Sequence, residues 1–269
     1  MTEKLVLELL IALTSGWSGF LFYWFLFLAV ALFELLRPSR RPRIAGGDRI
    51  TVNFGLGFFV AVLQMVPLFT TYVGALLAEE HGFGVLRLLD LPFWASVVVS
   101  FLLLDLAGYI FHRASHEVPL LWRLHRVHHS DRTVDASTTF RSHPLSVIVF
   151  IGFDFAVIYV LGVQPVGVLA YAVCKLLTMW LSHADITSAP RISALLATLF
   201  VTPAFHHRHH SAEQVYTDSN YGEVLTIWDR LFGTTSALDG DVERYGLGDD
   251  YDRDAASLSG QLKLPFKPL

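Results

Sequence analysis

The chain has 269 residues, of which 53% are hydrophobic and only 16% charged, and its mean hydropathy is +0.49. This composition favours an integral membrane protein over a soluble globule. The net charge of −4 and the pI near 6.3 give no sign of a nucleic-acid binder. The single cysteine, Cys174, excludes an internal disulfide and argues against a cysteine-based metal site.

The first hundred residues contain three long apolar runs. Residues 5–14 form a short apolar stretch that we interpret as part of a retained membrane anchor, because no small-residue cleavage pattern follows it. Residues 17–36 supply about twenty apolar residues, enough for a helix to cross a bilayer. Residues 54–77 are predicted to return across the membrane with a kink near Gln64 and Pro67, and residues 91–111 cross again.

Charge bias predicts the orientation of these crossings. Five arginines lie among residues 37–49, and arginine-rich short loops stay on the cytoplasmic side. The loop of residues 78–90 is biased towards acidic side chains and suits the outside. The third crossing therefore delivers His112 to the cytoplasmic face.

The remaining apolar runs predict a transmembrane hairpin. Residues 144–161 and 166–181 are joined by a short turn containing glycine and proline, and together they form the hairpin 144–182. Residues 192–200 are too short to span and are expected to lie at the interface. The chain from residue 203 onward is polar, and the last thirty or so residues look detachable because of their Gly and Asp content.

We therefore expect an all-α integral membrane protein with about four to five transmembrane helices and a cytoplasmic helical cap. It forms one integrated membrane domain in three parts. Residues 1–101 hold the N-terminal helices, residues 102–234 hold the histidine-bearing region with its hairpin, and residues 235–269 form a cytoplasmic tail.

Eleven of the twelve histidines lie between His112 and His210, and eight of them fall into three short clusters. The clusters are His112-x3-His116, His125-x2-His128-His129 and His206-x2-His209-His210. Residues i, i+3 and i+4 share a helix face, so each His-x2-His-His motif can direct three imidazoles at one point. So many imidazoles exceed the need of one metal ion and predict a two-metal site.

Other histidines lie outside this pattern. His143 and His183 sit at the ends of apolar runs, level with the clusters, and each is either a ligand or a hydrogen-bonded residue at the interface. Counting both gives ten nitrogen donors, or five for each of two ions. His207 points about 100° from His206 on a helix and is expected in solvent or behind the ligands. His81 stands alone and is interpreted as a satisfied interface residue.

Two residues upstream of His112 share its helical stripe. Asp105 and Tyr109 precede His112 and His116 at steps of four, three and four residues. A carboxylate inside a membrane helix is costly without a partner, and a metal-bound histidine needs an acceptor for its other ring N–H. Asp105 is therefore the stronger candidate to orient a ligand histidine, and Tyr109 the weaker.

The residues alone do not select the metal. Structural zinc needs four ligands and favours cysteine, which these histidines far exceed. Two neighbouring irons can reduce O2 and attack an unactivated C–H bond, which is chemistry that zinc cannot supply. Imidazole sites nevertheless bind zinc or copper at least as well as iron.

The histidine clusters belong to a longer series of motifs, which are Asp105-x3-Tyr109-x2-His112-Arg113-x2-His116, Leu121-Trp122-x2-His125-x2-His128-His129-Ser130, Arg141-x-His143-Pro144, His183, Thr202-Pro203-x2-His206-x2-His209-His210, Asp218-Ser219-Asn220-Tyr221-Gly222 and Trp228-Asp229-Arg230-Leu231-Phe232-Gly233-Thr234. In these motifs the sequence resembles the fatty acid hydroxylase and sterol desaturase superfamily of membrane di-iron enzymes. The resemblance covers residues 102–234, and the order of its three histidine clusters is specific.

The resemblance implies an O2-dependent di-iron hydroxylase or desaturase that acts on a membrane lipid, with a fatty-acyl or sterol-like substrate. It implies two iron ions held by His112, His116, His125, His128, His129, His206, His209 and His210, with His143 and His183 completing the set. Zinc can occupy such a site in purified protein. The enzyme is expected in the bacterial inner membrane or the eukaryotic endoplasmic reticulum, with its active site on the cytoplasmic side.

The C-terminal motif leaves two alternatives open. Asp218, Asn220 and Asp229 either cap local structure or hydrogen-bond ligand histidines. A short helix over residues 223–231 is expected to stop at Gly233 and to place Trp228 and Phe232 on the bilayer surface.

Electrons for O2 reduction must come from a separate donor protein. The sequence has no dinucleotide-binding glycine motif and no haem or iron–sulfur cysteine pattern. Four arginines either bind the acidic surface of that donor or a lipid phosphate, or are present only because positively charged loops stay on the cytoplasmic side. They are Arg123, Arg126, Arg141 and Arg208.

Two other classes of function compete with an oxidase. A metal transporter, or another metal-binding membrane protein without oxidase activity, would place its ligands near the bilayer midplane, whereas these apolar runs contain no histidine. A zinc hydrolase would need a His-Glu-x-x-His motif, and His116-Glu117 is not followed by that second histidine.

Overall fold

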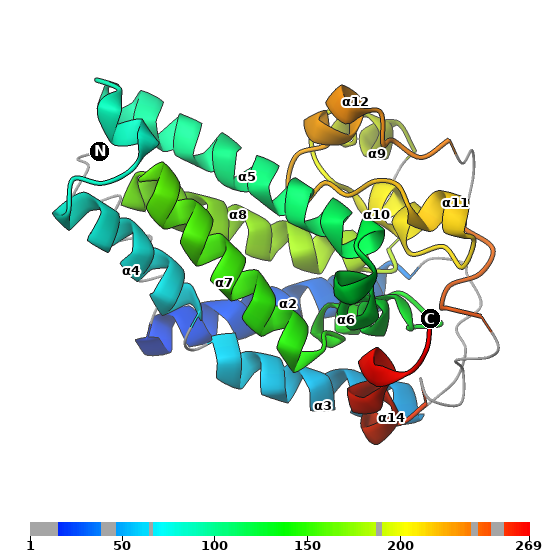
Figure 1. The fold of residues 1–269 in the computed structure, drawn as a ribbon. Helices are drawn as coiled ribbons and strands as arrows, with labels where there is room; N and C mark the ends of the chain where they lie inside the picture. The colour runs from blue at the N-terminus through cyan, green and yellow to red at the C-terminus, as the bar shows by residue number, and fades with distance from the viewer. Residues whose placement is uncertain (1–15, 39–46, 65–66, 187–189, 238–241, 249–255) are drawn as a thin grey trace.

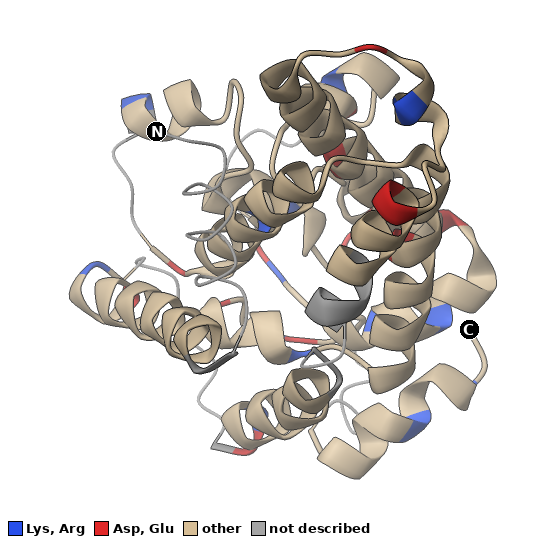
Figure 2. Ribbon diagram, turned by 90° about the vertical axis from the view of Figure 1, so that its left-hand side faces the viewer, with Lys and Arg blue, Asp and Glu red and all other residues tan. Residues whose placement is uncertain are grey.

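The computed structural model describes residues 16–38, 47–64, 67–186, 190–237, 242–248 and 256–269. The proposed anchor at residues 5–14 lies outside them. Within these ranges the chain forms helices and three isolated β-bridges but no strand, which confirms the all-α fold class. In Figure 2 most of the ribbon is tan, because charged residues are few along the chain.

Four described helices are long and apolar enough to cross a membrane. They are α2 (Gly16–Leu36), α5 (Phe93–Glu117), α7 (Pro144–Leu161) and α8 (Pro165–His183). Both α7 and α8 begin on a proline, which is pre-organised for the first helical turn. Gly162 ends α7 in the left-handed conformation, with φ of 63°, and so closes the predicted hairpin.

The second predicted crossing is two helices rather than one. Helix α3 (Gly47–Gln64) and helix α4 (Pro67–Glu80) replace the expected single span over residues 54–77. Pro67 begins the second helix, where its missing N–H costs no hydrogen bond. The start of α3 packs against η2 (Ala136–Phe140), and this contact brings Arg49 and Asn53 to the histidine region.

Small residues allow the close approach of neighbouring helices. A Cβ added to Gly167 of α8 would lie 2.5 Å from the Ser100 side chain of α5, and one added to Gly57 of α3 would lie 2.7 Å from Phe140. Small residues allow helix backbones to approach closely in a membrane. This packing holds α5 and α8, which carry three histidines of the site, side by side.

The short helices gather at one end of the long ones (Figure 1). They are α6 (Pro119–His129), η2, α9 (Pro190–Leu196), α10 (Pro203–His209), α11 (Gln214–Thr217), α12 (Ile227–Phe232), α14 (Leu258–Lys263) and η4 (Leu264–Phe266). A further short helix, η1 (Val85–Leu88), follows α4. The cap thus covers the ends of α5 and α8, where the histidine-rich segments begin and end.

The end of the chain is not detachable in the described residues. Leu264 is fully buried in a cluster with Val52, Leu56 and Val127. Arg126 donates hydrogen bonds to the carbonyls of Leu264, Lys267 and Pro268. Sequence composition suggested a loose tail because Gly and Asp are frequent there, but residues 256–269 carry the apolar side chains that pack on α3 and α6.

Candidate metal centre

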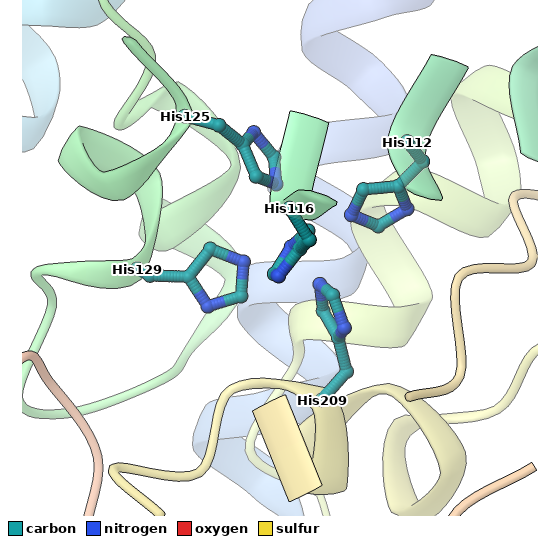
Figure 3. Close-up of side chains that lie close together, drawn as sticks. All are labelled: His112, His116, His125, His129 and His209. Carbon is teal, nitrogen blue, oxygen red and sulfur yellow. The ribbon is translucent and has the colours of Figure 1, made fainter. Parts of the chain in front are cut away.

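Nine histidines come together in two adjoining groups at the capped end of the bundle. The first group is His112 and His116 from α5, His125 and His129 from α6, and His209 from α10. Figure 3 shows these five side chains converging on one point. The second group is His128 from α6, His183 from α8, and His206 and His210 from α10 and its C-terminal cap. In each group the candidate ligand atoms lie within 4.8 Å of one another.

The three histidines of each His-x2-His-His motif are split between the two groups. The prediction that each motif directs all three imidazoles at one point is therefore wrong. His125 and His129 enter the first group while His128 enters the second. Likewise, His206 and His210 enter the second group while His209 enters the first. Residues i and i+4 are about 40° apart around a helix, whereas i+3 is displaced by about 100° from i+4. Each motif therefore gives two imidazoles to one group and one to the other.

The first group presents unpartnered nitrogens to its centre. Among the described residues, all five Nε2 atoms are buried without a hydrogen-bond partner. The opposite nitrogens of three rings are held from behind. His112 Nδ1 donates to Tyr221 O at 2.9 Å, His209 Nδ1 donates to Ser219 O at 2.7 Å, and His116 Nδ1 is 3.2 Å from Asp218 Oδ1.

These contacts fix the tautomer of two rings in the first group. A carbonyl oxygen can only accept, so the proton of His112 and of His209 sits on Nδ1 and leaves a lone pair on the inward Nε2. Buried polar atoms normally have partners, and several unpartnered nitrogens aimed at one point are typical of a set of metal ligands. Metal-bound histidines are oriented in this way, by an acceptor on the other ring nitrogen. The donor set therefore fits a metal ion.

The geometry of the second group also fits a cation. His128 Nδ1 donates to Arg141 O at 3.2 Å, and His183 Nδ1 donates to Met179 O at 2.8 Å. Their Nε2 atoms therefore carry lone pairs, yet these two atoms lie 3.1 Å apart. His206 Nε2 and His210 Nε2 lie 3.1 and 3.2 Å from His183 Nε2. A positive ion between the rings converts this repulsion into coordination.

Burial keeps these imidazoles neutral. Desolvation, reinforced by neighbouring histidines, lowers the pKa of His125, His129 and His209 well below its usual value. Desolvation is also the largest cause for His128, and its electrostatic interaction with His183 lowers the pKa of His128 further. A metal ion binds the neutral imidazole, so low pKa values leave the ligands ready at neutral pH.

The two groups of histidines are in direct contact with each other. The rings of His129 and His210, one from each group, stack with centroids 4.6 Å apart. The rings of His128 and His129 are 5.6 Å apart. Two ions held by these groups would be close neighbours, as a reaction shared between two metals requires.

The two predicted ligands outside the clusters, His143 and His183, occupy different positions. His183 is central to the second group, whereas His143 lies outside both groups in the structure. His143 Nδ1 accepts from Leu145 N and caps α7, and its Nε2 is 3.3 Å from Leu262 O. Both of its nitrogens therefore serve the fold. His81 lies far from the site, next to the hydroxyl of Tyr159.

His207 is behind the ligands and not in solvent. It is only 3% exposed, its Nε2 donates to His183 O at 3.1 Å, and its Nδ1 accepts from the Tyr245 hydroxyl at 3.1 Å. The solvent alternative is therefore wrong. His207 holds the backbone of a histidine in the second group.

The predicted orienting residues do not contact a histidine ring. Asp105 accepts hydrogen bonds from Val224 N, Leu225 N and Trp228 Nε1, at 3.1, 3.2 and 2.9 Å. Tyr109 bonds to Thr234 and stacks on Phe232. Trp228 is thus turned inward to Asp105 instead of lying on the bilayer surface, because a carboxylate buried in a membrane helix needs donors.

Asn220 and Asp229 hold the loop that carries the orienting carbonyls. Asp229 accepts from Tyr221 N and Gly222 N at 2.8 and 2.7 Å. Asn220 adopts a left-handed conformation with φ of 55°, and its side chain donates to Phe205 O. The alternative that these two side chains cap local structure is the one observed, and Asp218 is the carboxylate that reaches a ligand ring.

A buried polar network behind His128 was not expected from the sequence. Asp131 accepts hydrogen bonds from Arg49, Asn53 and Thr138, at 2.9, 3.1 and 2.8 Å. Arg141 donates to Asn53 Oδ1 at 2.8 Å, and the carbonyl of the same arginine orients His128. Arg126 and Arg141 are therefore buried structural residues and not a docking surface. The sign of this network in the sequence was Asp131, which follows the second histidine cluster by two residues.

A cavity of about 410 Å³ lies beside the first group. His116 and its partner Asp218 lie in its wall. The other lining residues are Arg113, Glu117, Val215, Ser219, Tyr221, Gly233, Thr234, Thr235, Ser236 and Ala237. His116 is the one histidine of the first group that lines this cavity.

Comparison with known proteins gives a consistent set of relatives. The family model described as fatty acid hydroxylase matches residues 97–234. The chain is 32% identical over 166 residues to alkylglycerol monooxygenase of Homo sapiens, covering 60% of this chain and 35% of that protein. It is 30% identical over 224 residues to ornithine lipid hydroxylase OlsE of Rhizobium tropici, covering 76% and 63%.

A third relative is a cholesterol 25-hydroxylase-like protein of Danio rerio, which is 32% identical over 156 residues, covering 56% of this chain and 57% of that protein. The chain thus spans between about a third and two thirds of the length of these relatives. No solved structure matches it. The relatives are named as monooxygenases and hydroxylases, which are oxidoreductases.

Proposed function

Because this chain belongs to the fatty acid hydroxylase family, we propose that it is a membrane enzyme that hydroxylates a lipid with two iron ions and O2. The observation that carries the proposal is the convergence of nine buried or half-buried histidines in two adjoining groups at the end of the membrane helices. Hydroxylation is favoured over desaturation because the relatives are named for that outcome.

Some residues of the protein would hold the metal ions, and others orient the histidines that hold them. The five histidines of the first group would hold one ion and the four of the second group the other. When bound, the iron pair supplies the redox chemistry that activates O2 against an unactivated C–H bond. Backbone carbonyls of Ser219, Tyr221, Arg141 and Met179 keep the proton of four imidazoles on Nδ1, so that Nε2 stays a ligand.

The membrane helices supply the substrate's environment. Helix α7 is largely unburied within the protein, so its apolar side chains face the surrounding lipid. A lipid chain would approach the histidines from this lipid-facing side of the protein. Arginine bias favours the cytoplasmic side for the cap, and electrons come from a separate donor protein. The cavity beside His116 is the face that such a donor would meet.

Metal analysis and lipid analysis together test the proposal. The protein is expressed under iron-replete conditions, purified in detergent, and measured for iron and zinc, while lipids of expressing and control cells are compared. We expect about two iron ions for each chain and a new hydroxylated lipid. Iron without any lipid change would favour a metal-binding membrane protein, and the absence of both would refute the proposal.

Single substitutions sharpen the test. His128→Ala and His209→Ala each remove a nitrogen from a different group and should abolish the product. His81→Ala is the matched control, because among the described residues that ring bonds only to Tyr159, at the opposite end of the bundle. Equal loss of product in all three variants would mean that the site is assigned wrongly.

A further inference from the structure

Helices α7 and α8 each contain one strongly charged side chain in an otherwise apolar span. Asp154 is the only Asp, Glu, Lys or Arg in Pro144–Leu161, and Lys175 is the only one in Pro165–His183. Charged residues inside a membrane are costly and commonly mark a functional site. Neither residue takes part in the metal centre.

Lys175 lies beside the metal centre and is only partly satisfied. Its Nζ is 3.4 Å from Glu223 Oε2, and Glu223 Oε1 is in turn 3.9 Å from His112 Nδ1. The ammonium also lies 4.2 Å from the centre of the Phe150 ring. The side chains of Lys175 and Glu223 are 19% and 23% exposed, so the ion pair is open to a ligand. One imidazole ring separates it from the first group of nitrogens.

Tyr171 adds an unpartnered hydroxyl to this ion pair. It lies one turn before Lys175 on α8, is 6% exposed, and its hydroxyl has no hydrogen-bond partner among the described residues. A Cβ added to Gly108 of α5 would lie 2.8 Å from this hydroxyl and 3.1 Å from Glu223 Cγ. The hydroxyl and Glu223 therefore both pack against Gly108, in a contact that a larger residue would prevent. A buried hydroxyl without a partner is costly unless a ligand satisfies it.

We propose that Tyr171, Lys175 and Glu223 form a polar subsite that binds a hydroxyl group on the lipid substrate. The subsite offers donors from Tyr171 and Lys175 and an acceptor from Glu223, which together match a group that both donates and accepts. A lipid carboxylate would have to displace Glu223 from Lys175, and a lipid amine would have to displace Lys175 from Glu223, whereas a hydroxyl group leaves the ion pair intact. The inference rests on the proposed function and narrows the substrate to a hydroxyl-bearing lipid.

Equilibrium binding to the full-length protein in detergent tests the subsite without turnover. Radiolabelled 1-hexadecanol is the probe, and hexadecyl methyl ether, palmitate and hexadecylamine are competitors. We expect the ether, which accepts but cannot donate, to compete about tenfold more weakly than unlabelled alcohol, and the two charged lipids more weakly still. Tyr171→Phe should weaken alcohol binding about fivefold, and Lys175→Met about tenfold or more.

Tyr159→Phe is the matched control, since it removes a tyrosine hydroxyl from the far end of α7. Iron content and the thermal midpoint of Tyr171→Phe should equal those of the unaltered protein, because its hydroxyl bonds to nothing in the described structure. Unchanged alcohol binding in Tyr171→Phe, or equal competition by alcohol and ether, would overturn the subsite.

The outcomes separate the subsite from the proposed function. Tyr171-dependent alcohol binding without any oxidised lipid in cells would support the subsite and refute the oxidation. Oxidised lipid in cells combined with equal binding of alcohol and ether would support the oxidation and refute the subsite.

Discussion

Asp105 is expected to stabilise the metal centre from a distance. Its carboxylate accepts three hydrogen bonds, from two backbone N–H groups and the Trp228 indole, and it is fully buried. These bonds tie α5 to the segment that follows Tyr221. The carbonyls of Ser219 and Tyr221, a few residues earlier, orient His209 and His112.

Asp105→Asn should loosen that segment. The asparagine oxygen has two lone pairs and lacks the negative charge, and its NH2 group would face a donor. At least one buried N–H loses its acceptor, at about 1–3 kcal/mol, and the two remaining bonds lose their charge assistance at about 1 kcal/mol each. The free energy of unfolding should fall by about 3–5 kcal/mol. Metal affinity should fall about tenfold to a hundredfold, as for other changes behind metal ligands.

Thermal unfolding in detergent and competitive chelation of iron measure the two effects. Trp228→Phe is the graded control, because it removes one of the three donors and leaves the carboxylate with two, at a cost of about 1–2 kcal/mol. An Asp105→Asn variant with the iron affinity of the unaltered protein would refute the link from α5 to the orienting carbonyls. An effect of Trp228→Phe as large as that of Asp105→Asn would refute the count of hydrogen bonds.

Two further predictions concern the histidines. The metal-free protein should lose stability as the pH falls from 7.5 to 5.5. In the unfolded chain His125, His128 and His129 take up protons near pH 6.5, whereas burial lowers the pKa of these side chains in the folded protein. Chemical denaturation at each pH measures the free energy of unfolding, and a value that does not change with pH would contradict the lowered pKa values. His143→Ala should cost about 1 kcal/mol through the lost cap of α7 yet leave iron content unchanged, and lost iron would make His143 a ligand.

Much of the site followed from spacing along the sequence. The pairs His112 and His116, His125 and His129, and His206 and His210 are each four residues apart, and that spacing alone places both members on one helix face. The apolar runs likewise indicated the four membrane helices, because the thickness of a bilayer sets their length.

The tertiary structure decided what lies opposite each face. His143 and His183 both stand at the end of an apolar run, and only the packing of α8 against α5 and α10 brings His183 to the other rings. Asp105 had the spacing of a ligand partner but bonds to a segment about 120 residues away. Helical periodicity fixes the direction of a side chain around its own axis. Which neighbour it meets depends on helix crossings set by contacts remote in sequence, such as Gly167 with Ser100, which local spacing does not encode.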